Sequence, residues 1–329
     1  MKSLRNINKT NLLITGSDGL VGKNLINFLK KKNKFNIIST NKKQLNLENY
    51  NKLFFFLRKN KINVVINAAA MTGGILKNQN NLITMLEKNL SINMNIIKAC
   101  HQASVKQLIY MGSSCIYPKK SKIPIKEESI LGSYLEPTNE GYALSKIIGA
   151  KLCGYYNNKY KTDFRCIMPC NLVGPGDKYD ILSGHVVPSL IKKFCDAVKY
   201  RKKEVFVWGT GEIYREFLDV RDLTNTIYLI MNKSRRNYKK ITQDFLINIG
   251  ANKQYKIKTI VKIIKTLTNY KEKIIYEPKY PDGVWSKKVS TKRLRNLIKG
   301  WKPNFSIKQS LQDCISDYKK KYDNKNSSI

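Results

Sequence analysis

The sequence predicts an α/β protein built on a doubly wound parallel sheet, with a smaller α/β domain toward the C-terminus. Two observations lead to this prediction. From residue 11 to about residue 168, short apolar runs typical of buried strands alternate with amphipathic helical patterns. After Pro169 and the turn Gly174–Gly176, this alternation becomes less regular. With 329 residues the chain is long enough for one large domain or two.

The first predicted strand, Asn11–Thr15, runs into a glycine-rich turn and then into a helical pattern from Leu20 to about Lys31. The turn has the spacing G-x-x-G-x-x-G. Its glycines permit a tight turn, the close approach of a pyrophosphate and close packing of helix on strand. A Rossmann-type dinucleotide site is therefore predicted, in which the cofactor contacts Gly16, Gly19, Leu20, Val21 and Gly22.

The second predicted strand, Phe35–Ser39, indicates which dinucleotide is bound. A cofactor with a free ribose 2′-hydroxyl usually meets an acidic residue just after this strand, and none is present. Lys42 or Lys43 can instead hold a 2′-phosphate, so the sequence favours NADP(H). The alternative is that both are ordinary surface lysines of a lysine-rich chain.

Small residues follow the third predicted strand, Val64–Asn67. The run Ala68–Ala70 and the pair Gly73–Gly74 let a cofactor lie against the backbone, or they serve packing alone. The alternation then continues with a helix, a strand, a helix and a strand, at Leu82–Ala103, Leu108–Met111, Tyr142–Tyr160 and Phe164–Met168.

Ser113 follows the strand Leu108–Met111, at an edge of the sheet where open α/β proteins bind ligands. Tyr142 and Lys146 lie four residues apart and so share one helical face. An ammonium beside a phenol lowers the pKa of the phenol, so we expect Tyr142 to exchange its proton near neutral pH. Together the three side chains make a set that reduces a carbonyl. Taken alone, a Tyr-x-x-x-Lys pair is more often an ordinary exposed helix pair.

In the second half, a helix is expected at Val186–Val198, a strand at Glu204–Trp208 and a helix at Ile257–Leu267. We expect three further segments to return to the large sheet domain: Arg215–Val220, helix Leu223–Asn232 and strand Phe245–Ile249. The predicted domains are residues 1–175 with about 215–250, and residues 176–214 with 251–322, the latter including Trp301. The polar tail from Lys319, above all residues 323–329, is expected to fray.

The charge is extreme, with 61 Lys and Arg against 23 Asp and Glu, a formal net charge of +38. This suggests nucleic-acid binding, which stays open as an alternative of a different class. The lysines are nevertheless spread along the chain among many Asn and Ile residues, as A/T-biased coding would produce. No helix-turn-helix, zinc-finger or aromatic RNA-binding signature accompanies them. Attraction of a small anionic substrate is favoured.

Composition also bears on the compartment. No apolar run approaches the ~18–20 residues that span a bilayer, and Met1–Asn11 shows no apolar signal core. The seven cysteines are scattered without a C-x-x-C pattern, which indicates reduced thiols in a cytoplasm. With only two histidines, a metal site is not expected.

Five motifs in a fixed order give the chain a recognisable character. They are Gly112–Pro118, Leu135–Tyr142, Met168–Pro175, His185–Pro188, and Trp208–Gly211 with Arg215–Leu218. Through them, residues 11 to about 320 resemble the extended short-chain dehydrogenase/reductases that act on GDP-sugars. The resemblance implies epimerisation of GDP-4-keto-6-deoxy-D-mannose at C3 and C5, reduction at C4 by NADPH, and a homodimer formed through the two long helices. A branch that acts on a 3-deoxy sugar has nearly the same motifs and stays open.

The resemblance implies that Ser113, Tyr142 and Lys146 perform the reduction, and that Cys115 and His185 perform the epimerisation. The residue types suit the chemistry. Enolate formation acidifies the protons next to the C4 ketone, and their inversion needs a base on one face and an acid on the other. A thiol of pKa about 8.5 and an imidazole of about 6.5 both exchange protons near neutral pH. Outside such motifs, each would more often be structural, as we expect for His101.

The resemblance also implies the binding residues. For the cofactor these are the glycine-rich turn, Lys42, Asn67, Ala68, Ala69, Ser113, Tyr142, Lys146, Pro169, Asn171, Leu172 and His185. For the nucleotide sugar they are Ser114, Cys115, Asn171, Lys193, Trp208, Arg215 and Lys287. Two of these cations can meet the diphosphate, and the indole of Trp208 can pack on a ring or belong to the core. The chain departs from the family pattern at Cys170, Val173 and Ser290.

Overall fold

The computed structural model describes residues 9–182, 184–242 and 246–322. Its main feature is a parallel six-stranded sheet in the order β2-β1-β3-β4-β5-β9. The strands are β1 (Thr10–Thr15), β2 (Phe35–Thr40), β3 (Val64–Asn67), β4 (Gln107–Met111), β5 (Phe164–Pro169) and β9 (Leu246–Ile249). The chain passes from β1 to β2 on one side and then to β3 on the other. The carboxyl ends of β1 and β3 therefore flank the switch point at which such sheets bind ligands.

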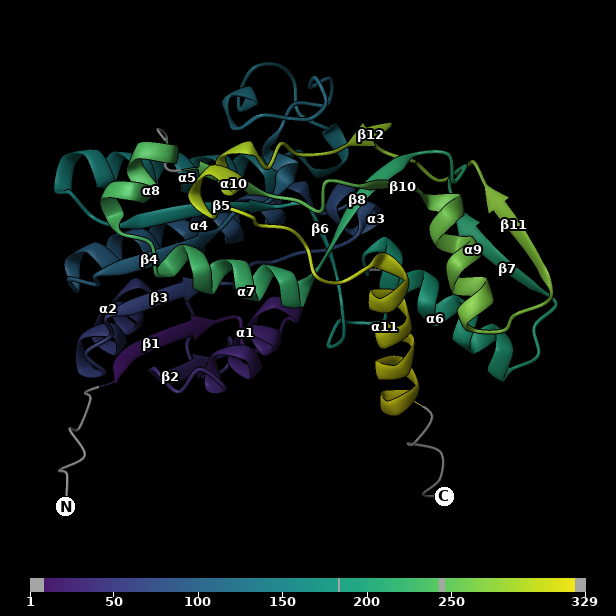
Figure 1. Ribbon diagram of the computed structural model, residues 1–329, viewed down its shortest axis with the longest axis horizontal. Coiled ribbons are helices and arrows are strands. Elements are labelled where there is room, and N and C mark those ends of the chain that lie inside the picture. Colours follow the sequence, from purple (N-terminus) through teal and green to yellow (C-terminus); the bar gives the residue numbers. More distant parts are fainter. Residues whose placement is uncertain (1–8, 183, 243–245, 323–329) are drawn as a thin grey trace.

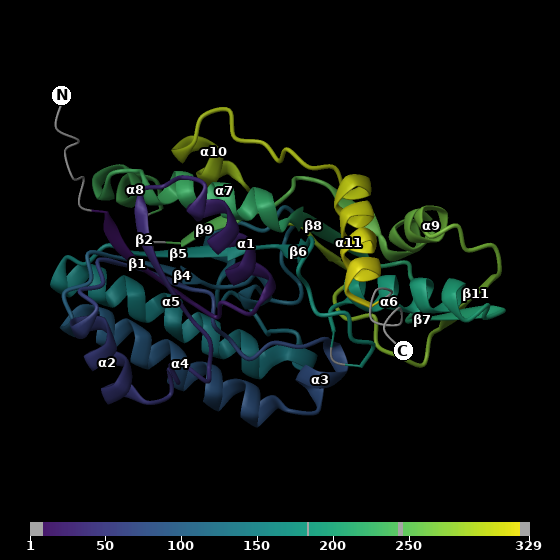
Figure 2. The ribbon, with the colours of Figure 1, turned by 90° about the horizontal axis from the view of Figure 1, so that it is seen from below.

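Helices cover both faces of this sheet (Figure 2). One face carries α1 (Leu20–Lys30), α7 (Val220–Met231), α8 (Arg235–Thr242) and α10 (Lys292–Leu297). The other carries α2 (Tyr50–Lys59), α4 (Leu82–Gln102) and α5 (Glu140–Tyr160). Successive strand residues point to opposite faces, yet Leu12, Leu13 and Ile14 are all fully buried, which only a sheet covered twice explains. The predicted doubly wound fold is confirmed.

A second hydrophobic cluster lies beside the first, at the right of Figure 1. It is built from α6 (Val186–Lys199), α9 (Ile257–Leu267), α11 (Ile307–Tyr322) and a two-stranded sheet of β7 (Glu204–Trp208) and β11 (Lys273–Glu277). The strand β8 (Tyr214–Asp219) runs between the clusters, with Phe217 in the second and Leu218 in the first. It pairs with β6 (Asn171–Val173), β10 (Gln254–Lys256) and β12 (Ser286–Lys287). The remaining elements are α3 (Ile75–Gln79) and three short 3₁₀ turns, Ser114–Ile116, Glu127–Ser129 and Pro137–Asn139.

The predicted helices and strands lie within a few residues of those observed, and α9 and β7 have the predicted bounds. The segment Arg215–Val220 forms β8, which pairs outside the large sheet because β9 occupies the outer edge of β5. The prediction for Trp301 is wrong. It does not join the second unit but packs in the first cluster, where its indole nitrogen donates to Thr226 Oγ1 at 2.9 Å.

The C-terminal tail differs in part from the prediction. Residues up to Tyr322 belong to α11, where the rings of Tyr318 and Tyr322 stack 4.7 Å apart and Lys321 pairs with Asp317. Residues 323–329, like Phe245 of the predicted strand Phe245–Ile249, lie outside the described part of the chain. The division into two domains stays a prediction. None of the helices within the described residues combines the length and apolarity of a membrane span.

Candidate active site

A cavity of about 910 Å³ opens at the carboxyl ends of the large sheet and extends to the second cluster. Most of the predicted site residues line it, although they come from distant parts of the chain. Those on its wall are Gly16, Gly19, Leu20, Val21, Lys42, Ala68, Ala69, Ser113, Cys115, Tyr142, Lys146, Pro169, Asn171, Leu172, His185, Lys193, Trp208, Arg215 and Lys287. Such a volume is at the upper end of the range for small-molecule sites.

The glycine-rich turn has the geometry expected of a pyrophosphate site. Gly16 has a φ of +68°, and a Cβ added there would lie 2.8 Å from the carbonyl of Ala68. A Cβ on Gly22 would lie 2.2 Å from the oxygen of Gly16, so Gly22 serves packing beneath the cavity. Helix α1 follows Gly19 without a side-chain cap. A dinucleotide therefore fits here, because the backbone can be approached closely and the helix N-terminus faces it.

The end of β2 provides one cation. Lys42 lines the cavity and its Nζ lies 3.5 Å from Glu48 Oε1, while Lys43 is not part of the wall. Asn67 is also off the wall: it is fully buried and accepts a hydrogen bond of 2.7 Å from Thr15 Oγ1, which ties β1 to β3. Ser114 is likewise buried behind the wall. For Asn67 and Ser114 the structure shows packing roles rather than direct contact with the cavity.

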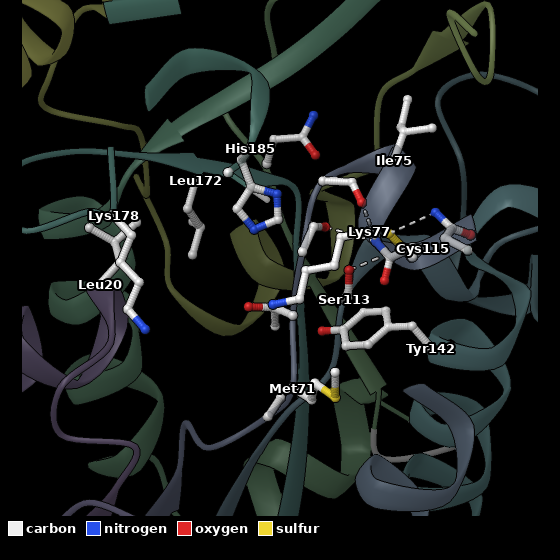
Figure 3. Close-up of a pocket in the computed structure, with 18 of the residues that line it drawn as sticks. Leu20, Met71, Ile75, Lys77, Ser113, Cys115, Tyr142, Leu172, Lys178 and His185 are labelled. Atoms are coloured by element: carbon white, nitrogen blue, oxygen red, sulfur yellow. Dashed lines mark hydrogen bonds between the residues drawn. The ribbon is translucent and has the colours of Figure 1, made fainter. Parts of the chain in front are cut away.

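Two members of the reduction set, Ser113 and Tyr142, lie close together in the cavity (Figure 3), and Lys146 lines the same cavity. Ser113 lies two residues after the end of β4, and its Oγ accepts a hydrogen bond of 3.2 Å from the backbone N–H of Cys115. Tyr142 and Lys146 face the cavity from the first two turns of α5. The Lys146 Nζ lies 5.7 Å from the centre of the Tyr142 ring and donates to the main-chain oxygen of Met111 at 2.8 Å.

The electrostatics of Tyr142 differ from the prediction. Burial raises the pKa of its hydroxyl, the charge of Cys115 raises it further, and a hydrogen bond with Ser113 opposes both. Burial also lowers the pKa of Lys146 to about 8. The predicted lowering of the Tyr142 pKa by Lys146 is therefore wrong, because burial dominates and the ammonium is bonded to Met111. A raised pKa keeps the phenol protonated, as a proton donor requires.

Cys115 lies in a charged corner of the cavity. It is the only one of the seven cysteines that is partly exposed. Asn139 Nδ2 donates to its sulfur at 3.6 Å. Burial lowers the pKa of Arg215 to about 10 and also lowers that of Lys287, and the charge of Cys115 opposes both shifts. The thiol is thus reachable from the cavity and close to two cations, the surroundings in which a cysteine becomes reactive.

His185 reaches the cavity from the side of the second hydrophobic cluster. It is exposed, precedes α6 and points into the cavity together with Leu172 and Lys178 (Figure 3). Burial raises the pKa of the nearby Asp177 carboxyl, and the charge of His185 opposes that rise. The structure therefore brings His185 to the cavity that holds Cys115, although 69 residues separate them in sequence.

The far end of the cavity carries the predicted nucleotide-sugar residues. Lys193 Nζ lies 4.5 Å from the centre of the Trp208 ring and donates to the oxygen of Phe206. The Trp208 ring stacks on Tyr280 at 4.6 Å and 25°. The sequence predicts that Arg215 binds the nucleotide sugar. In the structure its guanidinium donates to the carbonyls of Tyr214, Asp282 and Val284 and so holds the segment before β12.

Sequence reasoning missed several residues of the wall. Asn139, Glu136, Lys77, Tyr280 and Asp282 all line the cavity. Asn139 had a usable signal, because it lies three residues before Tyr142 within the motif Leu135–Tyr142. Tyr280 and Asp282 had none, since their loop reaches the cavity only through the pairing of β11 with β7 and of β12 with β8.

A glycine-rich turn at the switch point of a Rossmann-type sheet, facing a Ser–Tyr–Lys set, defines a nicotinamide-dependent enzyme of the short-chain dehydrogenase/reductase class. The chain belongs to the NAD dependent epimerase/dehydratase family, whose model matches residues 12–250. Both the predicted family and its enzymatic character are thereby confirmed.

The chain is similar to enzymes that act on GDP-sugars and to solved structures. The chain is 35% identical over 307 residues to the GDP-L-fucose synthase of Escherichia coli K12, covering 93% of this chain and 95% of that one. It is 36% identical over 306 residues to the GDP-L-colitose synthase of Yersinia pseudotuberculosis, with coverages of 93% and 95%. A structure of GDP-D-glycero-L-gluco-heptose synthase from Campylobacter jejuni, obtained in the presence of NADPH, matches with a TM-score of 0.86 at 26% identity, covering 94% and 98%.

Proposed function

We propose that the chain is a GDP-L-fucose synthase, which epimerises GDP-4-keto-6-deoxy-D-mannose at C3 and C5 and reduces C4 with NADPH. One observation supports this above all: Cys115 and His185 line the same cavity as Ser113, Tyr142 and Lys146. A simple reductase has no need of the first pair. Relatives from Escherichia coli and Sinorhizobium fredii lend further support, since both are GDP-L-fucose synthases.

In the epimerisation, one member of the Cys115–His185 pair removes the proton from the carbon beside the C4 ketone. The electron pair moves to the C4 oxygen, and Ser113 and Tyr142 stabilise the enolate by donating hydrogen bonds. The other member returns a proton to the opposite face of the carbon. Repeating this at the second carbon inverts both C3 and C5 and restores the ketone.

In the reduction, the nicotinamide supplies a hydride for C4 when it is bound. Tyr142 donates its proton to the C4 oxygen as the carbonyl becomes an alcohol. Ser113, which lines the cavity with Tyr142, donates a hydrogen bond that holds that oxygen in place. Lys146, near the phenol ring and with a pKa of about 8, supplies a positive charge as the phenolate forms. Solvent then reprotonates the phenolate.

NADPH is the proposed cofactor because Lys42 lines the cavity after β2 and the segment Thr40–Lys43 contains no acid. We assign cofactor binding to residues 1–175 with about 215–250, and the nucleotide sugar to residues 176–214 and 251–322 apart from α10 and Trp301, which pack on the large sheet. The seven free cysteines fit a reducing compartment, the cytoplasm.

A homodimer through α4 and α5 fits the exposed apolar residues of these helices. Ile83 and Met94 are 74% and 50% exposed and lie eleven residues apart on one stripe of α4. Ile148 and Tyr155 are 41% and 64% exposed and lie seven apart on one stripe of α5. Because α4 and α5 pack side by side, the stripes form the proposed dimer face (Figure 2).

The second candidate is a GDP-colitose synthase, favoured by the equally similar relative from Yersinia. The two are separated by giving the protein NADPH with either GDP-4-keto-6-deoxy-D-mannose or its 3-deoxy analogue, and comparing kcat/KM. The proposal expects the 3-hydroxy sugar to be preferred and its product to be GDP-L-fucose by mass spectrometry and sugar analysis. Preference for the 3-deoxy sugar would establish the second candidate instead.

A further inference from the structure

A chain of hydrogen bonds joins the residues of the two half-reactions. Asn139 Nδ2 donates to Cys115 Sγ at 3.6 Å, and the Cys115 backbone N–H donates to Ser113 Oγ at 3.2 Å. Ser113 in turn opposes the rise in the pKa of the Tyr142 hydroxyl. Figure 3 shows the two hydrogen bonds as dashed lines. Asn139 stands at the outer end of this chain.

The fold places Asn139 on the reactive face of α5. It immediately precedes the helix, and Tyr142 and Lys146 follow it by three and seven residues. Positions i, i+3 and i+7 share one helical face, so all three side chains reach the cavity from one element. Asn139 does not cap the helix with its side chain. Its amide is therefore free for the sulfur, and its Oδ1 is buried without a hydrogen-bond partner within the described residues.

The titratable groups around Cys115 come from three other elements. Tyr142 lies on α5, Arg215 on β8 and Lys287 on β12, and each interacts electrostatically with the thiol. Glu136, which precedes Asn139, interacts with both Arg215 and Lys287. Within the described residues, Asn139 is the one side chain that donates a hydrogen bond to the sulfur.

We propose that Asn139 is a positioning residue for Cys115, whose amide N–H holds the sulfur toward the cavity and stabilises its thiolate. A hydrogen bond to a charged acceptor is stronger than one to a neutral acceptor, so the amide favours the ionised form. The proposal rests on the proposed function in one respect: there the thiolate acts as a base and becomes a thiol when it takes up the proton. The bond itself is independent of the substrate.

The test is the pH dependence of alkylation of the intact protein by iodoacetamide, without substrate or cofactor. Cys115 is the selective target, because the other six cysteines are buried; Cys115→Ala supplies the background rate. Asn139→Ala is expected to move the midpoint of the rate profile up by about one pH unit, which is roughly tenfold slower alkylation at neutral pH. Asn139→Asp, which adds a negative charge at the same size, should move it further.

Asn81 provides a matched control. It precedes the other long helix, α4, with φ −137° and ψ 35°, close to −137° and 20° for Asn139, and neither side chain caps its helix. Asn81→Ala should leave the profile unchanged. If Asn139→Ala does not fold, as judged by thermal melting, Asn139→Asp decides. An unchanged midpoint in the Asn139 variants, or equal shifts in Asn81→Ala and Asn139→Ala, would overturn the proposal. Loss of the sugar activity alone would not, because alkylation does not depend on it.

Discussion

The Lys146 ammonium donates to the main-chain oxygen of Met111 at 2.8 Å, while its distance to the centre of the Tyr142 ring is 5.7 Å. This buried lysine ties the first turns of α5 to the end of β4, directly beside the residues that carry the proposed chemistry. Its burial lowers the pKa of the amine to about 8, from 10.5 for an exposed lysine.

A prediction for stability follows from this pKa. Between pH 8 and 10.5 the unfolded chain binds the lysine proton that the folded chain has lost, so this group makes stability rise with pH in that window. Lys146→Met should remove the contribution and lower the slope of unfolding free energy against pH by up to about 1.4 kcal/mol per pH unit. Urea unfolding at pH 8, 9 and 10 measures it. Lys159→Met, an exposed position of α5, should leave the slope unchanged.

Cofactor preference tests whether Lys42, after β2, holds the 2′-phosphate of NADPH. Lys42→Ala should raise the KM for NADPH severalfold more than that for NADH, because only NADPH carries the 2′-phosphate that this cation would hold. Lys43→Ala is the matched control, since Lys43 is not part of the cavity wall. Equal KM values for both cofactors in the parent protein would refute this use of Lys42.

The oligomeric state in solution tests the proposed dimer face. Ile148→Glu places a charge on the exposed stripe of α5 and should convert a dimer to a monomer in sedimentation velocity, because burying an unpaired carboxylate is costly. Tyr200→Glu changes an exposed side chain after α6, away from the proposed dimer face, and should leave the dimer intact. A parent protein that sediments as a monomer at micromolar concentration contradicts the proposal.

The epimerisation pair is tested with the keto sugar in D₂O and without NADPH. Cys115→Ala should slow entry of deuterium at C3 and C5 by ~10²–10⁴-fold, the usual value of one general acid or base. The same is expected for His185→Ala. Mass spectrometry and proton NMR of the recovered sugar measure the exchange. Exchange at the parental rate at both carbons in Cys115→Ala would reduce Cys115 to a packing residue.

The sequence predicted the strand–helix alternation well, because it depends on local periodicity and on the glycine turn at Gly16. It also placed Ser113, Cys115, Tyr142 and Lys146, which lie in two short motifs on elements of predictable type. The pKa of Tyr142 was predicted in the wrong direction, because proximity along a helix gives the charge of Lys146 but not the burial of either group.

Long-range pairing explains what the sequence did not reveal. The pairing of β8 with β6, β10 and β12 depends on strands of two or three residues, which have no periodicity to detect. Tyr280 reaches Trp208 through that arrangement, and Trp301 joins the first cluster through its bond to Thr226. The contacts of Tyr280 with Trp208 and of Trp301 with Thr226 each join residues more than 70 positions apart.

The central claim is that one cavity holds two separable sets of residues, one for epimerisation and one for reduction. The most direct test is Tyr142→Phe with GDP-4-keto-6-deoxy-D-mannose, measuring NADPH oxidation and, in D₂O, deuterium at C3 and C5. Removing the phenolic proton leaves the shape of the site, and Ser113 still binds the enolate oxygen. NADPH oxidation should nearly vanish while deuterium still enters both carbons at a readily measured rate. NADPH oxidation near the parental rate, or equal loss of both activities, would contradict the account.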